Sequence, residues 1–213
     1  MVIYLETNMP SSIHIPPGGF PAFWYACGYL LTLERLTGRK QKCSGTSAGA
    51  LAAWVLAHES VTIERLYDAA VSCLADGTWL HCLDWYVRRF MTAVDNTCGT
   101  FVPEFYDGVY VTTLFDRTPI HLLNTRGDVS RDVRASCFIP VLSGGFMGPD
   151  GYMDGAIGWG GTCVNRVTLR RPRTISVCTA LFPLRSHLLE YEHGSQDCHT
   201  EYLAGTSLSH TDG

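Results

Sequence analysis

The sequence predicts an α/β fold with parallel strands covered by helices. Short β-like runs at 12–15 and 39–44 each lead into a glycine-containing turn, and a helical pattern follows each turn. A β–loop–α–β–turn–α order of this kind favours parallel strands, because the helix carries the chain back across the sheet. With 213 residues the chain is long enough for one substantial core. We therefore expect a single domain over residues 1–213, with a core at about 12–180 and a polar tail at about 185–213.

The composition indicates a globular protein whose main partner is not nucleic acid. Hydrophobic residues make up 46% of the chain, charged residues make up 17%, and the formal net charge is −4. Phosphate binding needs a basic face, which this charge does not favour. Residues 1–13 lack the pattern of a secretory signal, and no run reaches the roughly 18 apolar residues of a spanning helix. We expect an intracellular protein, either cytoplasmic or peripheral on membranes, and the sequence does not indicate an oligomeric state.

The nine cysteines contain no Cys-x-x-Cys pair, so neither zinc ligation nor a redox dithiol is indicated. Reduced, buried thiols in an intracellular protein are the expectation, and disulfides in a secreted protein are the alternative. No metal and no cofactor are expected.

The N-terminal half alternates strands and helices. A helix is expected from Pro21 to about Leu36, because apolar residues recur there at steps of three and four, and Gly38 suits its exit. Further helices are expected at 47–58, which is almost wholly apolar, and at 62–75, capped by Ser60 or Thr62. The aromatic-rich stretch 79–91 has two interpretations. It is a helix packed on the core, or it is an acyl-chain groove or lid that touches lipid, with Arg88 and Arg89 near head groups.

The second half continues with shorter elements. Two strands at 109–114 and 119–123 form a hairpin-like pair, and a short helix at 131–137 is stopped by Pro140. A glycine-rich loop at 144–151 leads into a strand at 152–154 that ends at a carboxylate on a turn. The last strand is expected at 174–178. From residue 185 the chain becomes polar, and 207–213 is expected to fray.

The chemistry of the chain is expected at Ser47. Residues 45–49 read Gly-Thr-Ser-Ala-Gly, preceded by a strand and followed by a strongly helical run. A serine on such a strand-to-helix turn exposes its hydroxyl where the helix N-terminus favours negative charge. Gly45 and Gly49 flank it because a Cβ in so tight a turn would collide with neighbouring elements. A plain turn before a buried helix is the other interpretation of this pattern.

A serine nucleophile also needs a base and donors for the oxyanion. Gly18 and Gly19 are the candidate donors, because they lie between a strand and a helix N-terminus, and Phe20 is grouped with them at the substrate. The base is Asp154 or a histidine, with His187, His193 and His199 as candidates for a triad. In an α/β-hydrolase, which uses a histidine triad, several strands precede the nucleophile. Here only one βα unit precedes Ser47, so the histidine triad is disfavoured.

Four motifs together resemble the patatin-like phospholipases. They are Pro-Gly-Gly-Phe-Pro-Ala-Phe-Trp-Tyr-Ala-Cys-Gly at 17–28, Gly-Thr-Ser-Ala-Gly-Ala-Leu at 45–51, Arg-Ala-Ser-Cys-Phe-Ile-Pro at 134–140 and Tyr-Met-Asp-Gly-Ala at 152–156. The resemblance covers about residues 12–160. It implies a three-layer α/β/α sandwich with a mainly parallel central sheet. It also implies a Ser–Asp dyad of Ser47 and Asp154, with Gly18 and Gly19 in the oxyanion loop. Pro17 stands where the family has a first glycine. Because proline has no N–H, the hydrogen bonds to the oxyanion must come from Gly18 and Gly19.

The resemblance implies a lipid acyl hydrolase acting on phospholipid or acylglycerol esters through an acyl-enzyme. Its expected partner is a lipid or phospholipid substrate, with peripheral membrane contact. Two alternatives stay open: a transacylase that uses a lipid hydroxyl as acceptor, and a catalytically silent lipid-binding protein of the same fold.

Overall fold

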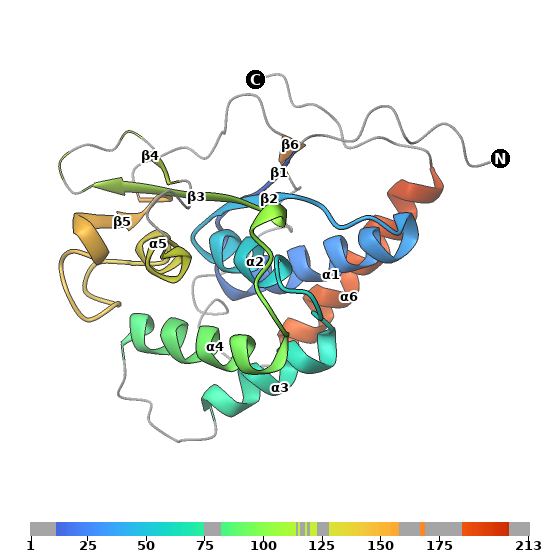
Figure 1. The fold of residues 1–213 in the computed structure, drawn as a ribbon, viewed down its shortest axis with the longest axis horizontal. Coiled ribbons are helices and arrows are strands. Elements are labelled where there is room, and N and C mark those ends of the chain that lie inside the picture. The colour runs from blue at the N-terminus through green and yellow to red at the C-terminus, as the bar shows by residue number, and fades with distance from the viewer. Residues whose placement is uncertain are drawn as a thin grey trace.

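The structure is a computed structural model that describes residues 12–74, 82–113, 115, 118, 120–122, 128–157, 167–168 and 185–204. The elements follow one another along the chain (Figure 1) in the order β1 (Ile13–Ile15), α1 (Gly19–Thr37), β2 (Cys43–Thr46), α2 (Ala48–Leu56), α3 (Ile63–Leu74), α4 (Leu83–Thr97), η1 (Pro103–Phe105), β3 (Tyr106–Thr113), β4 (Ile120–Leu122), α5 (Val129–Ser136), η2 (Pro149–Gly151), β5 (Tyr152–Asp154), β6 (Val167–Thr168) and α6 (Arg185–Leu203).

The sheet is mixed and mainly parallel, in the order β4-β3-β2-β1-β6. The central pairs β6–β1, β1–β2 and β2–β3 are parallel, whereas β4 and β5 each run antiparallel to β3. The expected α/β class and the antiparallel pair of strands β3 and β4 are therefore confirmed. In Figure 1 the helices of the described chain lie on one side of the sheet. The finer expectation of a three-layer sandwich stays a prediction.

Strand β5 lies beyond the end of β2 on the same edge of β3. Val111 pairs with Ile120 of β4 and also with Asp154 of β5, so these two strands must occupy opposite edges of β3. Strand β2 also lies opposite β4, and its last residue, Thr46, pairs with Tyr110. The chain therefore turns away from β3 at Thr46, and Asp154 takes the next position along that edge. This register places Asp154 next to the end of β2 at Thr46, although the two residues are far apart in the sequence.

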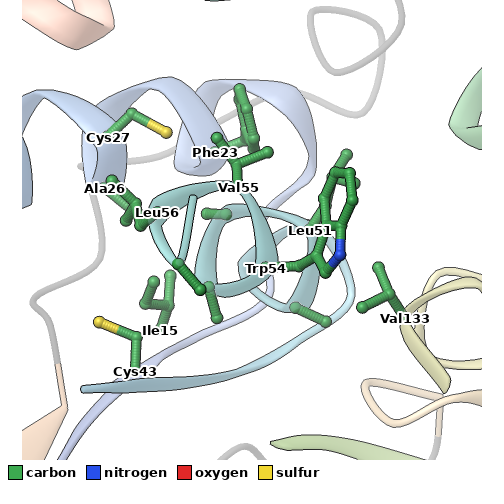
Figure 2. Close-up of a cluster of buried hydrophobic side chains, with 14 of the residues drawn as sticks. Ile15, Phe23, Ala26, Cys27, Cys43, Leu51, Trp54, Val55, Leu56 and Val133 are labelled. Atoms are coloured by element: carbon green, nitrogen blue, oxygen red, sulfur yellow. The ribbon is translucent and has the colours of Figure 1, made fainter. Parts of the chain in front are cut away.

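Helix α2 forms the centre of the core. Every residue from Gly49 to Leu56 is buried, as its apolar composition predicts. Figure 2 shows this helix between α1 on one side and strands β1 and β2 on the other. Its side chains meet Phe23 and Cys27 of α1, Ile15 and Cys43 of the strands, and Val133 of α5. A helix buried on all sides cannot shift easily, so the turn at its N-terminus has a fixed position.

Helix α6 occupies much of the segment that the sequence presents only as a polar tail. It packs along α1 (Figure 1), and side-chain hydrogen bonds join the two helices. The hydroxyl groups of Tyr25, Tyr29 and Thr32 donate hydrogen bonds to Asp197, Glu201 and Ser195 at 2.8, 2.6 and 2.8 Å. A helix held in this way needs no broad apolar stripe, which is why the sequence pattern did not reveal it.

Two glycines allow α1 and α6 to approach closely. A Cβ on Gly28 would lie 2.0 Å from the carbonyl oxygen of Tyr191, and one on Gly194 would lie 2.1 Å from that of Tyr25. We expect Gly28→Ala to lower the free energy of unfolding by about 2–3 kcal/mol, because the backbone of α6 must move away. Denaturant unfolding measures this loss.

The matched control is Gly38→Ala at the C-terminal cap of the same helix. A Cβ there meets nothing within 4 Å, although the φ angle of +67° is left-handed. We expect Gly38→Ala to lower the free energy of unfolding by only about 1 kcal/mol, because alanine is less favourable than glycine in a left-handed conformation. If Gly28→Ala were no more destabilising than Gly38→Ala, the close crossing of α1 and α6 would be wrong.

Several boundaries differ from the sequence expectations. The second strand covers Cys43–Thr46 rather than beginning at Arg39, and the helix expected at 131–137 begins at Val129. Strand β6 was not expected, and the strand expected at 174–178 lies outside the described residues. The part of segment 79–91 that is described belongs to α4, a helix that continues to Thr97. Among the described helices, none combines the length and the apolar character that crossing a membrane requires.

Candidate active site

Ser47 lies on a sharp turn between β2 and α2. Its backbone has φ 58° and ψ −129°, a conformation that a residue with a side chain rarely adopts. Such strain costs about 1–3 kcal/mol and persists only where the surrounding structure imposes it. Here the two flanking glycines show the constraint: a Cβ on Gly45 would lie 2.1 Å from the carbonyl oxygen of Gly49, and a Cβ on Gly49 would lie 2.2 Å from that of Ile15. The turn therefore has the geometry of a nucleophile elbow.

Asp154 ends strand β5 and is only 2% exposed. Burial raises the pKa of its carboxyl group to about 6, because the charged form loses its hydration. Hydrogen bonds from the Ser47 side chain and from the backbone N–H of Ala156 act in the opposite direction on this pKa. The Ala156 bond to Oδ1 measures 2.8 Å. Near neutral pH the group is therefore mostly a carboxylate, yet one basic enough to take a proton.

The side chain of Ser47 lies beside the carboxyl group of Asp154 and acts to lower its pKa. The register described above explains this contact, because Asp154 takes the position on β3 that follows the end of β2. Gly155 makes the approach possible, since a Cβ on it would lie 2.6 Å from the carbonyl oxygen of Tyr110. The structure thus brings together the two residues that the sequence indicated as nucleophile and base.

Ser136 of α5 and Cys137 in the turn after it bind the backbone of Ser47. No role was expected for either residue from the sequence. The N–H of Ser47 donates a hydrogen bond of 3.0 Å to Oγ of Ser136, which in turn donates to the carbonyl of Tyr110 at 2.6 Å. The thiol of Cys137 donates to the carbonyl of Ser47 at 3.1 Å. Burial, with a smaller contribution from the charge of Asp154, raises the pKa of this thiol well above its ordinary value, so it remains a donor. In the sequence, the only indication of a role for Ser136 and Cys137 is their position in the motif at 134–140.

The candidate oxyanion loop lies at the same end of the sheet as the elbow. Strands β1 and β2 are parallel neighbours, and the chain leaves β1 at Ile15 to reach Gly18 and Gly19. Helix α1 begins at Gly19, so Gly19 and Phe20 belong to the first turn, whose N–H groups have no carbonyl of their own helix to bond. The close approach of Gly49 to the carbonyls of Ile15 and Pro16 places this loop beside the elbow. Pro21 supplies no N–H, which leaves the residues before it as donors.

The histidines named as alternative bases lie on α6. The side chains of His193 and His199 are exposed, and Nδ1 of His193 lies 3.7 Å from a carboxylate oxygen of Glu190 on the same helix. The side chain of His187 lies outside the described residues. By contrast, His14 of β1 is buried beneath the elbow, where its ring nitrogens lie 3.3 and 3.4 Å from the hydroxyls of Ser44 and Thr46. Among the candidate bases of the described chain, Asp154 is therefore the one whose pKa the side chain of Ser47 affects.

No protein-family model matches this chain, and no curated protein matches it in sequence.

Proposed function

We propose that the protein is a serine acyl hydrolase that cleaves lipid esters through an acyl-enzyme, in the manner of the patatin-like phospholipases. One observation carries this proposal: a serine on a strained strand-to-helix turn lies beside a buried carboxylate whose pKa is raised to about 6. A carboxylate of ordinary pKa is a weak base toward a hydroxyl, and burial makes it a better one. The pairing of nucleophile and base does not require a histidine.

In the first step Asp154 takes the proton of Ser47 as the serine oxygen bonds to the ester carbonyl carbon. The negative charge that develops on the carbonyl oxygen faces the N-terminal ends of α1 and α2, where backbone N–H groups of Gly18 and Gly19 would bind it. When the carbon–oxygen bond to the alcohol breaks, Asp154 gives its proton to the departing alcohol. The acyl group then remains on Ser47.

In the second step water replaces the alcohol. Asp154 takes a proton from the water, the hydroxide bonds to the acyl carbon, and the bond to Ser47 breaks as the proton returns to the serine oxygen. The products are a carboxylic acid and an alcohol. The aromatic-rich start of α4 and the motifs of the resemblance support a lipid as the source of the acyl group.

Labelling with a fluorophosphonate tests this proposal, because the reagent bonds covalently to an activated serine. We expect the wild-type protein to be labelled at Ser47 and Ser47→Ala to remain unlabelled. The labelling rate should rise with pH through about 6, since the pKa of Asp154 is raised to that value and only its deprotonated form accepts the proton. Mass spectrometry of the peptide identifies the site. Unlabelled wild-type protein, at pH values on both sides of 6, would instead indicate a silent lipid-binding protein.

A further inference from the structure

The loop between α5 and β5 exposes a cluster of large apolar side chains. Four of the large apolar side chains that are exposed in the described chain lie close together here: Val141, Leu142, Phe146 and Met147. Val141 is 71% exposed and Phe146 is 77% exposed, and the other two are about half exposed. We call residues 139–147 the apolar loop. Contiguous exposed apolar surface on a protein marks a place where it binds something.

The apolar loop is held in one conformation by its own hydrogen bonds. The N–H of Val141 donates to the carbonyl of Gly145 at 2.7 Å, and that of Ser143 donates to Ile139 at 2.9 Å, while Oγ of Ser143 accepts from the N–H of Ile139 at 3.0 Å. Val141 has a φ of 71°, which is unfavourable for a β-branched residue. The fold thus keeps a strained valine directed into solvent. A side chain that is only filling space would not need this arrangement.

The apolar loop is attached both to the candidate active site and to α4. Just before it, Cys137 binds the backbone of Ser47, and Phe138 accepts a hydrogen bond from the N–H of Asp154 at 2.8 Å. At its tip, the carbonyl of Leu142 accepts a hydrogen bond of 2.8 Å from Leu83, the first residue of α4. Trp85 and Tyr86 follow in the first turn of that helix, and the guanidinium of Arg89 lies 5.2 Å from the ring centre of Trp85.

We propose that the apolar loop, with the first turn of α4, inserts into a zwitterionic phospholipid surface and so presents the candidate active site to lipid. Tryptophan, tyrosine and arginine beside inserted apolar side chains are typical of proteins that bind the interface of a bilayer. The choice of a lipid surface rests in part on the proposed function, because the apolar loop adjoins Ser47 and Asp154.

The size of the cluster favours a lipid surface over a second copy of the chain. The four side chains expose on the order of 400 Å². A stable dimer buries about 800 Å² on each partner. An interfacial protein, by comparison, needs only a few side chains to reach the boundary between head groups and acyl chains.

The charges around the apolar loop favour a zwitterionic surface over an anionic one. Arg134 and Arg88 share the single carboxylate of Asp84, and Arg131 pairs with Asp150, so these three guanidinium groups and two carboxylates leave about one positive charge and not a basic cluster. The whole chain carries a net charge of −4. Contact should therefore come from burial of apolar side chains and should depend little on salt.

Sedimentation with phosphatidylcholine vesicles tests this proposal on the Ser47→Ala protein, which leaves the lipid intact. We expect this protein to bind the vesicles and Phe146→Ser, made in the same background, to lower the partition coefficient about tenfold or more. The matched control is Phe115→Ser, because Phe115 is 91% exposed and lies outside the apolar loop. It should bind within about twofold of its parent, and binding should persist in about 0.5 M sodium chloride.

Each other outcome overturns the proposal. Absence of vesicle binding, or an equal loss with Phe115→Ser, would show that the apolar loop does not dock on lipid. Binding that needs anionic lipid, or that salt abolishes, would indicate attraction by charge instead. Self-association by sedimentation velocity that Phe146→Ser removes would assign the surface to a second copy. The fluorophosphonate experiment is independent: labelling without vesicle binding contradicts only the docking proposal, and vesicle binding without labelling contradicts only the proposed function.

Discussion

Asp154→Asn is expected to lower ester turnover by about 10³-fold or more while it makes the protein more stable at neutral pH. The loss of turnover follows from the removal of the base that we propose for Ser47, and general base catalysis contributes roughly 10²–10⁴ in rate. The gain in stability follows from burial. The carboxylate of Asp154 is only 2% exposed, so its charge is unfavourable in the folded protein, and asparagine carries no charge.

The direction of the stability change follows from the pKa values. Burial raises the pKa of Asp154 from 3.8 to about 6, so between these two pH values the folded protein binds more protons than the unfolded chain. Stability therefore falls as pH rises through this window and stays low above about pH 6. A shift of this size corresponds to about 3 kcal/mol. We expect Asp154→Asn to recover much of it at neutral pH and to remove this pH dependence, which denaturant unfolding at several pH values measures.

Asp150→Asn is the matched control, since it changes an aspartate four positions earlier whose carboxylate pairs with Arg131 on the surface. It should keep the turnover of the wild-type protein and its stability profile between pH 4 and 6. If Asp154→Asn kept full turnover, Asp154 would not be the base. If it lost turnover and also lost stability at neutral pH, Asp154 would be a structural group and not a strained functional one.

The two residues of the proposed dyad were predictable because they lie in local patterns. The elbow at Ser47 needs glycines at fixed offsets, and a carboxylate at the end of a strand followed by glycine is visible in the sequence without any knowledge of the fold. Their meeting was not derivable in this way. It depends on the register of β3, which pairs Tyr110 with Thr46 and Val111 with Asp154, and long-range pairing leaves no local signal.

Two parts of the structure, α6 and the apolar loop, were not apparent from the sequence. Helix α6 binds α1 through side-chain hydrogen bonds, and its composition resembles a solvated tail. The apolar loop shows the reverse case. In the sequence its side chains look like ordinary hydrophobic residues that would be buried, and only the structure shows that they are exposed. Hydrophobic pattern predicts which residues can be buried, whereas the partners available in space decide which ones are.

Ser136→Ala is expected to lower turnover about 10- to 100-fold without removing either residue of the dyad. Ser136 is fully buried, and its hydroxyl connects the N–H of Ser47 to the carbonyl of Tyr110. Alanine leaves both backbone groups without this partner, which costs about 1–3 kcal/mol. The strained elbow would then relax, and a displacement of the serine oxygen by a fraction of an ångström is enough to slow attack on a carbonyl.

The measurements separate this positioning role from a general loss of stability. We expect kcat to fall with KM nearly unchanged, because the apolar loop is intact. The pH profile should keep its rise through about 6, because Asp154 remains. Ser130→Ala on the same helix is the control. Its side chain is exposed and lies 4.0 Å from the sulfur of Met91, so its removal should leave kcat as it is. Equal losses in both variants would mean that α5 supports the site only through its folding, and that the hydroxyl of Ser136 does not hold the nucleophile in place.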